Sequence, residues 1–295
     1  MITNIALLIT FASISAISRG IISVIDRYQM GYRKQGVIEV NFINNLFSII
    51  LVTVFFSVMV KKYNFPAFSA AYAIRIVVYA LVVQMVAYGY SYIYKKINIM
   101  QSVAVNKLSD LFIPLALFLT TGYLNWKSYV VSILTTIIVA IYIFYKEKKA
   151  ELDKDAMLKS IAVIVPLLVF QSAISPVLTH GVGNIYDLIF FTIFTIYIRG
   201  IIALIAFIAK INHIQNLGLS KGILLLYTSR AILTLLAQIT YTLSTSSPQS
   251  SISWVFLNIT PLYSVLFGNM VLHEKIKWSD GVVVLLIFVL ALIPK

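Results

Sequence analysis

Two ionisable residues, Lys107 and Asp110, stand three positions apart inside the hydrophobic stretch SVAVNKLSD, residues 102–110. Residues at i and i+3 share one face of a helix, so this carboxylate can pair with the ammonium. Lys107 lies about nine residues into an apolar stretch, roughly 14 Å along a helix, near the middle of a bilayer core about 30 Å thick. A charge there costs about 2.5–3.5 kcal/mol unless it has a partner or a wet cavity. The pattern indicates either an ion pair that locks two helices or a substrate-facing cation moderated by Asp110. We favour the cation, with Asn106 beside it.

An amide stripe precedes this pair in the stretch EVNFINNLFS, where Asn41, Asn44 and Asn45 recur at i, i+3 and i+4. This spacing places all three amides on one side of a helix. Such a stripe can join neighbouring helices by hydrogen bonds. If it faces a cavity, it offers donors and acceptors to a polar ligand.

Further charges fall within or near the ends of apolar stretches, at Arg19, Arg75, Arg199 and Arg230. A long basic side chain near a span end can extend to the headgroups, but several such charges together indicate a polar pathway between helices. We expect Arg75 or Arg230 to supply a second cation to the substrate. Gln238 shares a helix face with Arg230, and Tyr79 lies deep enough in its stretch to form part of the wall.

Two carboxylates, Glu39 and Asp110, are candidates for proton coupling. Enzyme signatures such as HExxH, GxSxG and the P-loop are absent from the sequence, and its three histidines have no ligand spacing. The absence of cysteine excludes disulfides and Cys-ligated metals. We therefore expect a protein that is not an enzyme and needs no metal or other cofactor.

The composition explains which elements must hold these residues in place. The chain has 295 residues, 60% hydrophobic and 11% charged, with a mean hydropathy of +0.95. These values predict an all-α integral membrane protein. The net charge of +13 is scattered between apolar stretches, which argues against nucleic acid as a partner. The predicted spans are about ten helices at 2–25, 36–60, 67–94, 98–121, 126–146, 157–179, 184–209, 219–243, 249–272 and 277–294.

A polar linker at the midpoint, YKEKKAELDKDAMLK, separates two halves at 1–147 and 157–295. Each half has about five spans, and an offset of 152 pairs Trp126 with Trp278 and Asn106 with Asn258. An odd number of spans reverses the second half in the membrane, so the pattern predicts two inverted five-helix repeats. Asn258 is thereby a further candidate ligand.

Most loop lysines and arginines fall on the side of the midpoint linker, and the positive-inside rule favours both termini outside the cytoplasm. We expect a multi-pass protein of the cell membrane, the inner membrane in a bacterium.

The last span pair, residues 251–294, resembles the signature of the drug/metabolite transporter (DMT) superfamily, in particular its EamA-like ten-helix members. The features are Pro261-Leu262-Tyr263 within a span, His273-Glu274-Lys275-Ile276 in a short turn and a final apolar span from Gly281. The resemblance covers essentially the whole chain, since such members have two EamA-like five-helix repeats.

Within that superfamily, SVAVNK resembles the Gly-Ala-Leu-Asn-Lys motif of nucleotide-sugar transporters, and NFINN resembles their Phe-Tyr-Asn-Asn motif. In those transporters the motifs lie in the second half, whereas here they lie in the first. Sugar-phosphate translocators also place a lysine on the fourth span. The matching residues are Asn44, Asn45, Asn106 and Lys107.

The resemblance and the charged spans together predict a secondary transporter that moves a polar, anionic metabolite, similar to a nucleotide sugar or sugar phosphate, by alternating access. Its partners would be this small-molecule substrate and the lipid bilayer, with proton coupling or exchange as the driving force. Two alternatives stay open: an exporter or facilitator of amino acids or of cationic or aromatic metabolites, and a lipid-linked-sugar flippase. The sequence leaves the oligomeric state open.

Overall fold

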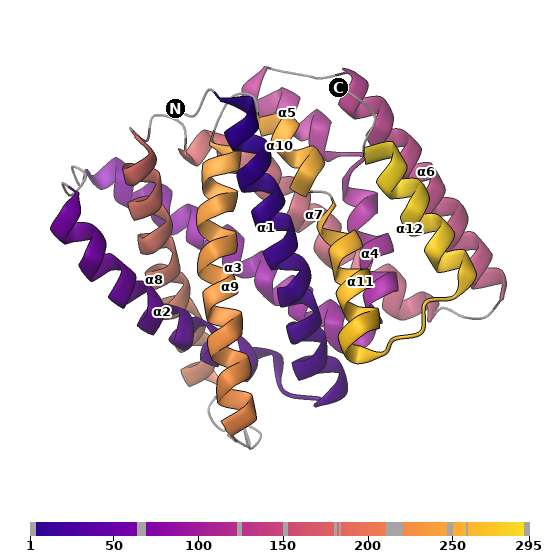
Figure 1. The fold of residues 1–295 in the computed structure, drawn as a ribbon, viewed down its shortest axis with the longest axis horizontal. Helices are drawn as coiled ribbons and strands as arrows, with labels where there is room; N and C mark the ends of the chain where they lie inside the picture. Colours follow the sequence, from indigo (N-terminus) through magenta and orange to yellow (C-terminus); the bar gives the residue numbers. More distant parts are fainter. Residues whose placement is uncertain are drawn as a thin grey trace.

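A computed structural model describes residues 4–63, 69–122, 126–149, 153–179, 182, 184–210, 221–246, 250–257 and 259–291. Every regular element in these ranges is a helix (Figure 1). The elements are α1 (Ile5–Arg27), η1 (Tyr28–Tyr32), α2 (Val37–Lys62), α3 (Ala70–Lys96), α4 (Ile99–Ser109), α5 (Ile113–Thr121), α6 (Trp126–Lys148), α7 (Lys154–Thr179), α8 (Ile185–Ala209), α9 (Lys221–Thr245), α10 (Ser250–Leu257), α11 (Thr260–Leu272) and α12 (Trp278–Ala291).

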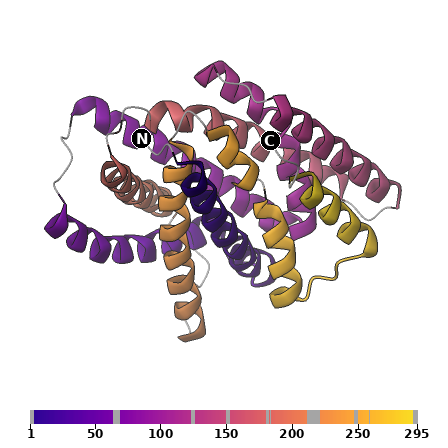
Figure 2. The same ribbon diagram turned by 45° about the horizontal axis from the view of Figure 1, so that its top comes forward.

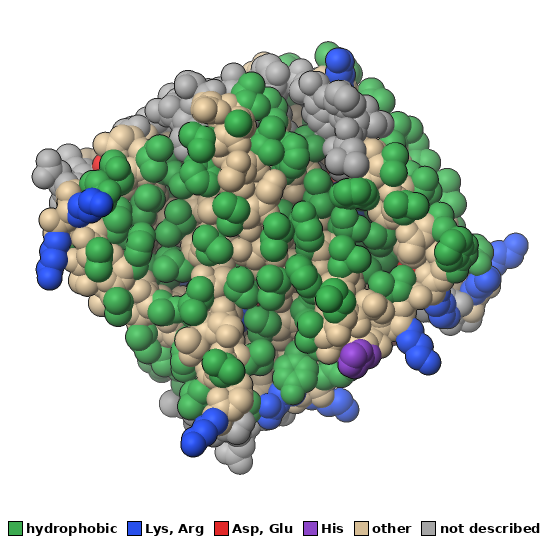
Figure 3. Space-filling model, in the orientation of Figure 1, with side chains coloured by type: hydrophobic (Ala, Val, Ile, Leu, Met, Phe, Trp, Pro, Cys, Tyr) green, Lys and Arg blue, Asp and Glu red, His purple; other side chains and the backbone are tan. Residues whose placement is uncertain are grey.

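Nine helical segments of the described chain are long and apolar enough to cross a membrane, and α12 adds a shorter apolar helix. Hydrophobic side chains cover most of the face shown in Figure 3, with Lys and Arg mainly at its edges. Helices satisfy their own backbone hydrogen bonds, which a lipid environment requires. The predicted fold class is confirmed: the chain is an all-α, multi-pass membrane protein.

Two of the predicted spans are broken into two helices each. The span predicted at 98–121 divides into α4 and α5, and the span at 249–272 divides into α10 and α11. Pro114 lies in the first turn of α5, and Pro261 lies in the first turn of α11. Proline lacks an N–H donor, so it suits the first turn of a new helix better than the interior of a long one. The two prolines are 147 positions apart.

The two ends of the sequence interleave in the bundle. α1 packs against α9 and α11, while α3 packs against α7 and α8, and α2 lies against α8 and α9. In Figures 1 and 2, α2 and α8 form one side of the molecule, and α6 and α12 form the other. α1, α3, α4, α9 and α11 lie between these sides, so the centre is built from both halves of the chain.

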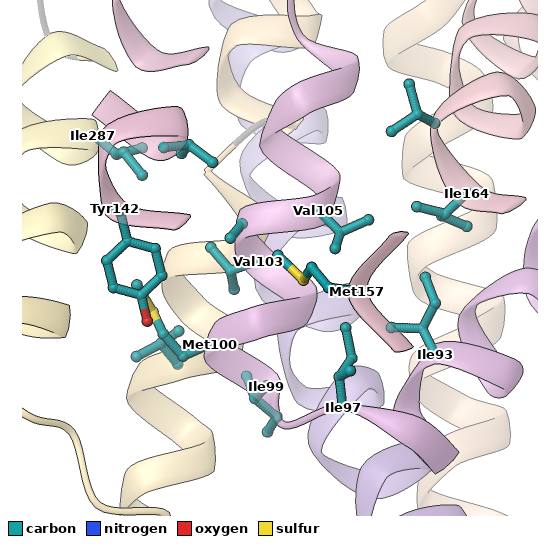
Figure 4. Close-up of a cluster of buried hydrophobic side chains, with 14 of the residues drawn as sticks. Ile93, Ile97, Ile99, Met100, Val103, Val105, Tyr142, Met157, Ile164 and Ile287 are labelled. Carbon is teal, nitrogen blue, oxygen red and sulfur yellow. The ribbon is translucent and has the colours of Figure 1, made fainter. Parts of the chain in front are cut away.

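The helix α4 that carries Lys107 is fixed by an apolar cluster. Figure 4 shows Met100, Val103 and Val105 of α4 among side chains of α3, α6, α7 and α12. In a membrane, such packing stabilises by close van der Waals contact. Because these apolar side chains hold the helix on several sides, the orientation of its polar residues is determined.

Candidate functional site

A cavity of about 170 Å³ lies among α1, α3, α4, α7, α8, α9, α10 and α11. Six charged side chains line it, four basic and two acidic, so the lining has an excess of two positive charges. The charged residues are Arg19, Asp26, Lys107, Asp110, Arg199 and Arg230. The polar residues include Ser23, Tyr90, Tyr94, Asn106, Ser109, Gln171, Thr234, Gln238, Thr260 and Ser264.

Lys107 faces this cavity with a partner. Its Nζ donates a hydrogen bond to Asp110 Oδ2 at 2.9 Å, and both residues are buried. α4 ends at Ser109, directly before Asp110, so the carboxylate lies at the break before α5. The pair is thus both a buried ion pair and part of the cavity wall, where the sequence had suggested one or the other. Asn106 also lines the wall, and its buried Oδ1 has no hydrogen-bond partner among the described residues.

Arg230 likewise has its own carboxylate, Asp26. Arg230 Nε donates to Asp26 Oδ1 at 2.6 Å, and Nη2 donates to Oδ2 at 2.9 Å. The planar guanidinium matches both oxygens of one carboxylate, so this bidentate pair is strong and directional. Asp26 was not predicted as a site residue because the first span was expected to end at residue 25, whereas α1 continues to Arg27.

The remaining two cations have no carboxylate partner in the described part of the chain. The Arg19 guanidinium lies 4.0 Å from the centre of the Tyr241 ring, a cation–π contact. Arg199 is 5% exposed, and its Nε donates to Gln84 Oε1 at 3.0 Å. A buried cation without an opposite charge, such as Arg199, is an expensive arrangement, and the half-buried Arg19 adds a second such charge, so the two account for the anion-attracting character of the cavity. Both had been noted as charges within spans, but neither was expected to be a ligand.

The amide stripe of α2 lies outside the cavity lining and joins α2 to α3. Asn41 Nδ2 donates to Ser91 Oγ at 2.7 Å, and Asn45 Nδ2 lies 3.5 Å from Gln84 Oε1. Asn44 is buried, and neither of its side-chain polar atoms has a partner in the described chain. Gln84 Oε1 also accepts a hydrogen bond from Arg199, so the stripe is connected to this cavity residue through Gln84.

The other expected site residues take separate positions. Gln238 lines the cavity with Arg230, as their shared helix face predicts. Tyr79 packs in an apolar cluster, with its ring centre 5.3 Å from that of Phe191. Arg75 is half-buried near the start of α3, and Glu39 is in the first turn of α2; neither lines the cavity. Asn258 lies outside the described residues.

Apolar side chains form one part of the cavity wall. Val83, Ile113, Trp254 and Leu257 belong both to the cavity wall and to the cluster that contains Tyr79 and Tyr241. The Trp254 and Tyr241 rings meet edge to face with centres 5.8 Å apart.

An ionic contact lies beside the cavity, next to Tyr94. Arg27 Nε donates to Glu274 Oε1 at 3.0 Å, and Arg27 Nη1 donates to the Tyr94 carbonyl at 2.6 Å. Glu274 Oε2 also accepts from the Ile99 backbone N–H at 3.1 Å. This contact ties α1, α3 and α4 to the connection between α11 and α12. Tyr94 itself lines the cavity, so the contact lies directly at its edge.

The described residues include no group of His, Asp or Glu arranged to hold a metal ion. The charged and polar side chains that line the cavity offer charge recognition and hydrogen bonding. No protein-family model matches the sequence, and a search of curated proteins finds no significant match.

Proposed function

We propose that the chain is a secondary transporter of the drug/metabolite type that moves a small organic anion across the cell membrane by alternating access. The observation that carries the proposal is the central cavity with Arg19 and Arg199, two cations that no carboxylate of the described chain neutralises. Charged residues inside membrane spans mark substrate and ion pathways, and here they gather around one cavity.

The interleaved packing supports alternating access. If residues 1–147 and 157–295 are two inverted repeats, α1 corresponds to α7 and α3 corresponds to α9. The contact of α1 with α9 then corresponds to the contact of α7 with α3, and both contacts occur. A cavity at the interface of two such repeats can open to either side when one repeat rocks against the other. In this cycle, the apolar part of the wall and the Arg27–Glu274 contact would close the two ends of the cavity in turn.

The cavity size favours a small substrate. A water molecule occupies about 30 Å³ of liquid, and pockets for drug-sized ligands have roughly 300–1,000 Å³. A volume of about 170 Å³ suits a dicarboxylate or a short phosphorylated acid. Of the two substrate classes suggested by the sequence motifs, the sugar-phosphate-like class fits this space better than a nucleotide sugar.

A ligand screen on the purified protein tests the proposal. A ligand at a hundred times its Kd stabilises the folded state by about 2.7 kcal/mol, which raises the melting temperature. We expect a shift with succinate, phosphoenolpyruvate or a hexose phosphate, and none with a quaternary amine. Arg199→Gln should remove the shift, whereas Lys210→Gln, an exposed position at the end of the same helix, should retain it. Uptake of the stabilising anion into proteoliposomes then tests transport itself.

A second function, the export of aromatic amino acids, is favoured by one observation. Tyr90, Tyr94 and Trp254 line the cavity, and Lys107 is held by Asp110. An aromatic amino acid would place its carboxylate at Arg199 and its ring among these side chains. The same screen separates the two functions, because this one requires a shift with tyrosine or tryptophan and none with succinate.

A further inference from the structure

The pair of Asp26 and Arg230 bridges α1 and α9, which come from opposite halves of the chain. Asp26 is 5% exposed and Arg230 is 8% exposed, and both line the central cavity. In a site this buried, each charge depends on the other, because one charge left alone would be costly. A carboxylate that loses its arginine in such surroundings is strongly driven to the neutral form and takes up a proton.

The other carboxylate that lines the cavity, Asp110, already has Lys107 as its ion-pair partner. Arg230 and Tyr227 face Asp26 from α9, Tyr94 faces it from α3, and the cations Arg19, Lys107 and Arg199 line the same cavity. On α1 itself, Ser23 accepts a hydrogen bond from the Tyr94 hydroxyl at 2.8 Å. Arg230 is thus the direct ion-pair partner of Asp26.

An anion in the cavity competes with Asp26 for Arg230. Arg19 and Arg199 lack carboxylate partners in the described chain and draw an anion into the same space that Arg230 lines. A carboxylate or phosphate of the substrate offers the guanidinium the same planar, bidentate contact that Asp26 offers. Binding of the anion to Arg230 therefore releases Asp26.

A series of buried polar groups leads from this pair toward the end of the bundle where α1 meets α2. Gln29 follows Asp26 by three residues, and Tyr227 precedes Arg230 by three, so each lies about one turn farther along its helix. Both are 0% exposed, and the side-chain amide of Gln29 has no hydrogen-bond partner among the described residues. Gln35, which lies beside the Tyr227 hydroxyl, also has a buried, unpartnered Oε1.

These groups have the character of a hydrated path. Buried polar atoms without protein partners are the sites at which internal water binds. Gln29 belongs to the π-helical turn η1, a distortion that often marks functional sites because it widens the helix. Gln35 is half-buried and follows the exposed Arg33 and Lys34, so the path reaches the basic surface.

We propose that Asp26 is a proton-binding site that couples anion movement to proton movement, with Gln29, Tyr227 and Gln35 forming its proton path to the basic end. Its use in transport rests on the proposed function. When the anion takes Arg230, one proton moves from water to the Asp26 carboxylate. When the cavity then opens to the other side and the anion leaves, Arg230 returns to Asp26 and the proton leaves with the anion through the open cavity. One proton then accompanies each anion, and no covalent bond of the substrate is broken.

Infrared spectroscopy of the purified protein tests the proton site without any substrate. Arg230→Gln imitates the state in which the anion has taken the arginine, so it should show a protonated-carboxyl band at neutral pH. The band should be absent from the wild type, from Arg230→Lys and from the double variant Arg230→Gln/Asp26→Asn. Gln29→Leu in the Arg230→Gln background should slow the deuterium shift of the band at least about tenfold, because water is lost from the path.

The proposal is overturned if Arg230→Gln lacks the band, or if the band survives in the double variant. A band whose deuterium shift is unaffected by Gln29→Leu would overturn the path. Gel filtration and a melting curve verify that each variant is folded. Arg230→Lys retains a positive charge beside Asp26, so it separates the effect of losing the charge from the effect of replacing the side chain. A failure of anion uptake in proteoliposomes would overturn the transport function and leave the infrared result unchanged, so the two failures are distinguishable.

Discussion

Gln84 Oε1 accepts a hydrogen bond from Arg199 Nε at 3.0 Å and lies 3.5 Å from Asn45 Nδ2. One amide thus connects a cavity cation on α8 with the polar stripe on α2. Gln84 is 1% exposed, so water does not readily replace it. The guanidinium of Arg199 depends on this contact for its orientation, since no carboxylate of the described chain holds it.

Gln84→Leu should weaken anion binding while the charge of Arg199 stays in the cavity. A hydrogen bond to a charged group contributes about 1.5–3 kcal/mol, so the Kd should rise at least about tenfold. Titration of the stabilising anion by calorimetry measures the change. Ser91→Ala is the matched control on the same helix, because it removes the partner of Asn41 without touching Arg199. Equal losses in the two variants would show that general α2–α3 packing, and not Arg199, is responsible.

Lys107→Ala should destabilise the fold because it leaves the buried Asp110 carboxylate without its ammonium. Breaking a buried pair on one side typically costs about 3–5 kcal/mol. The double variant Lys107→Met/Asp110→Leu removes both charges and should regain most of this stability. Thermal melting of the three proteins measures the effect. Anion binding by the double variant then shows whether Lys107 also touches the substrate: retained binding assigns the charge contact to Arg19 and Arg199.

The sequence predicted the helices well because a membrane span is defined by hydrophobic length. The span predicted at 36–60 corresponds to the helix Val37–Lys62, and the span predicted at 184–209 corresponds to the helix Ile185–Ala209. The i, i+3 relation of Lys107 and Asp110 was also readable, since both residues lie on one local segment. Long-range contacts carry no such signal. Arg230 and Asp26 are 204 positions apart, and only the packing of α1 on α9 brings them together.

Other features were visible in the sequence but ambiguous. The asparagines of α2 marked a polar face, yet their spacing does not tell which neighbour that face meets, and it meets α3. Pro114 and Pro261 were inside predicted spans, and hydropathy cannot distinguish a kinked span from two separate helices. The prolines also define an offset of 147, which differs from the offset of 152 that the tryptophans give.

Gly20 should be intolerant of any side chain because α1 approaches α11 closely there. A Cβ at this position would lie 2.5 Å from the Tyr263 Cβ and 3.2 Å from the Ser264 backbone nitrogen. Small residues permit such close approach of membrane helices. Gly20→Ala should therefore lower stability by about 1–3 kcal/mol, the usual range for overpacking. Gly222→Ala, where a Cβ meets nothing within 4 Å, is the control and should be neutral or slightly stabilising in a melting experiment.

Glu274→Gln should loosen the closure at the Arg27 end of the cavity. The carboxylate of Glu274 accepts hydrogen bonds from both Arg27 and the Ile99 backbone, and the amide would lose the charge that holds Arg27.

The chain contains no cysteine, so a single Gln238→Cys in the cavity wall provides a unique label site. In the Glu274→Gln background, a membrane-impermeant thiol reagent should label this cysteine at least about tenfold faster from the side of Arg27, because about 1.4 kcal/mol less holds the closure. Reagent applied to the other side should react at an unchanged or lower rate, since a population shift toward one opening disfavours the other. Lys275→Gln, the exposed neighbour of Glu274, should leave both rates unchanged. Equal acceleration from both sides would show a general loosening of the bundle and would contradict a closure at this end.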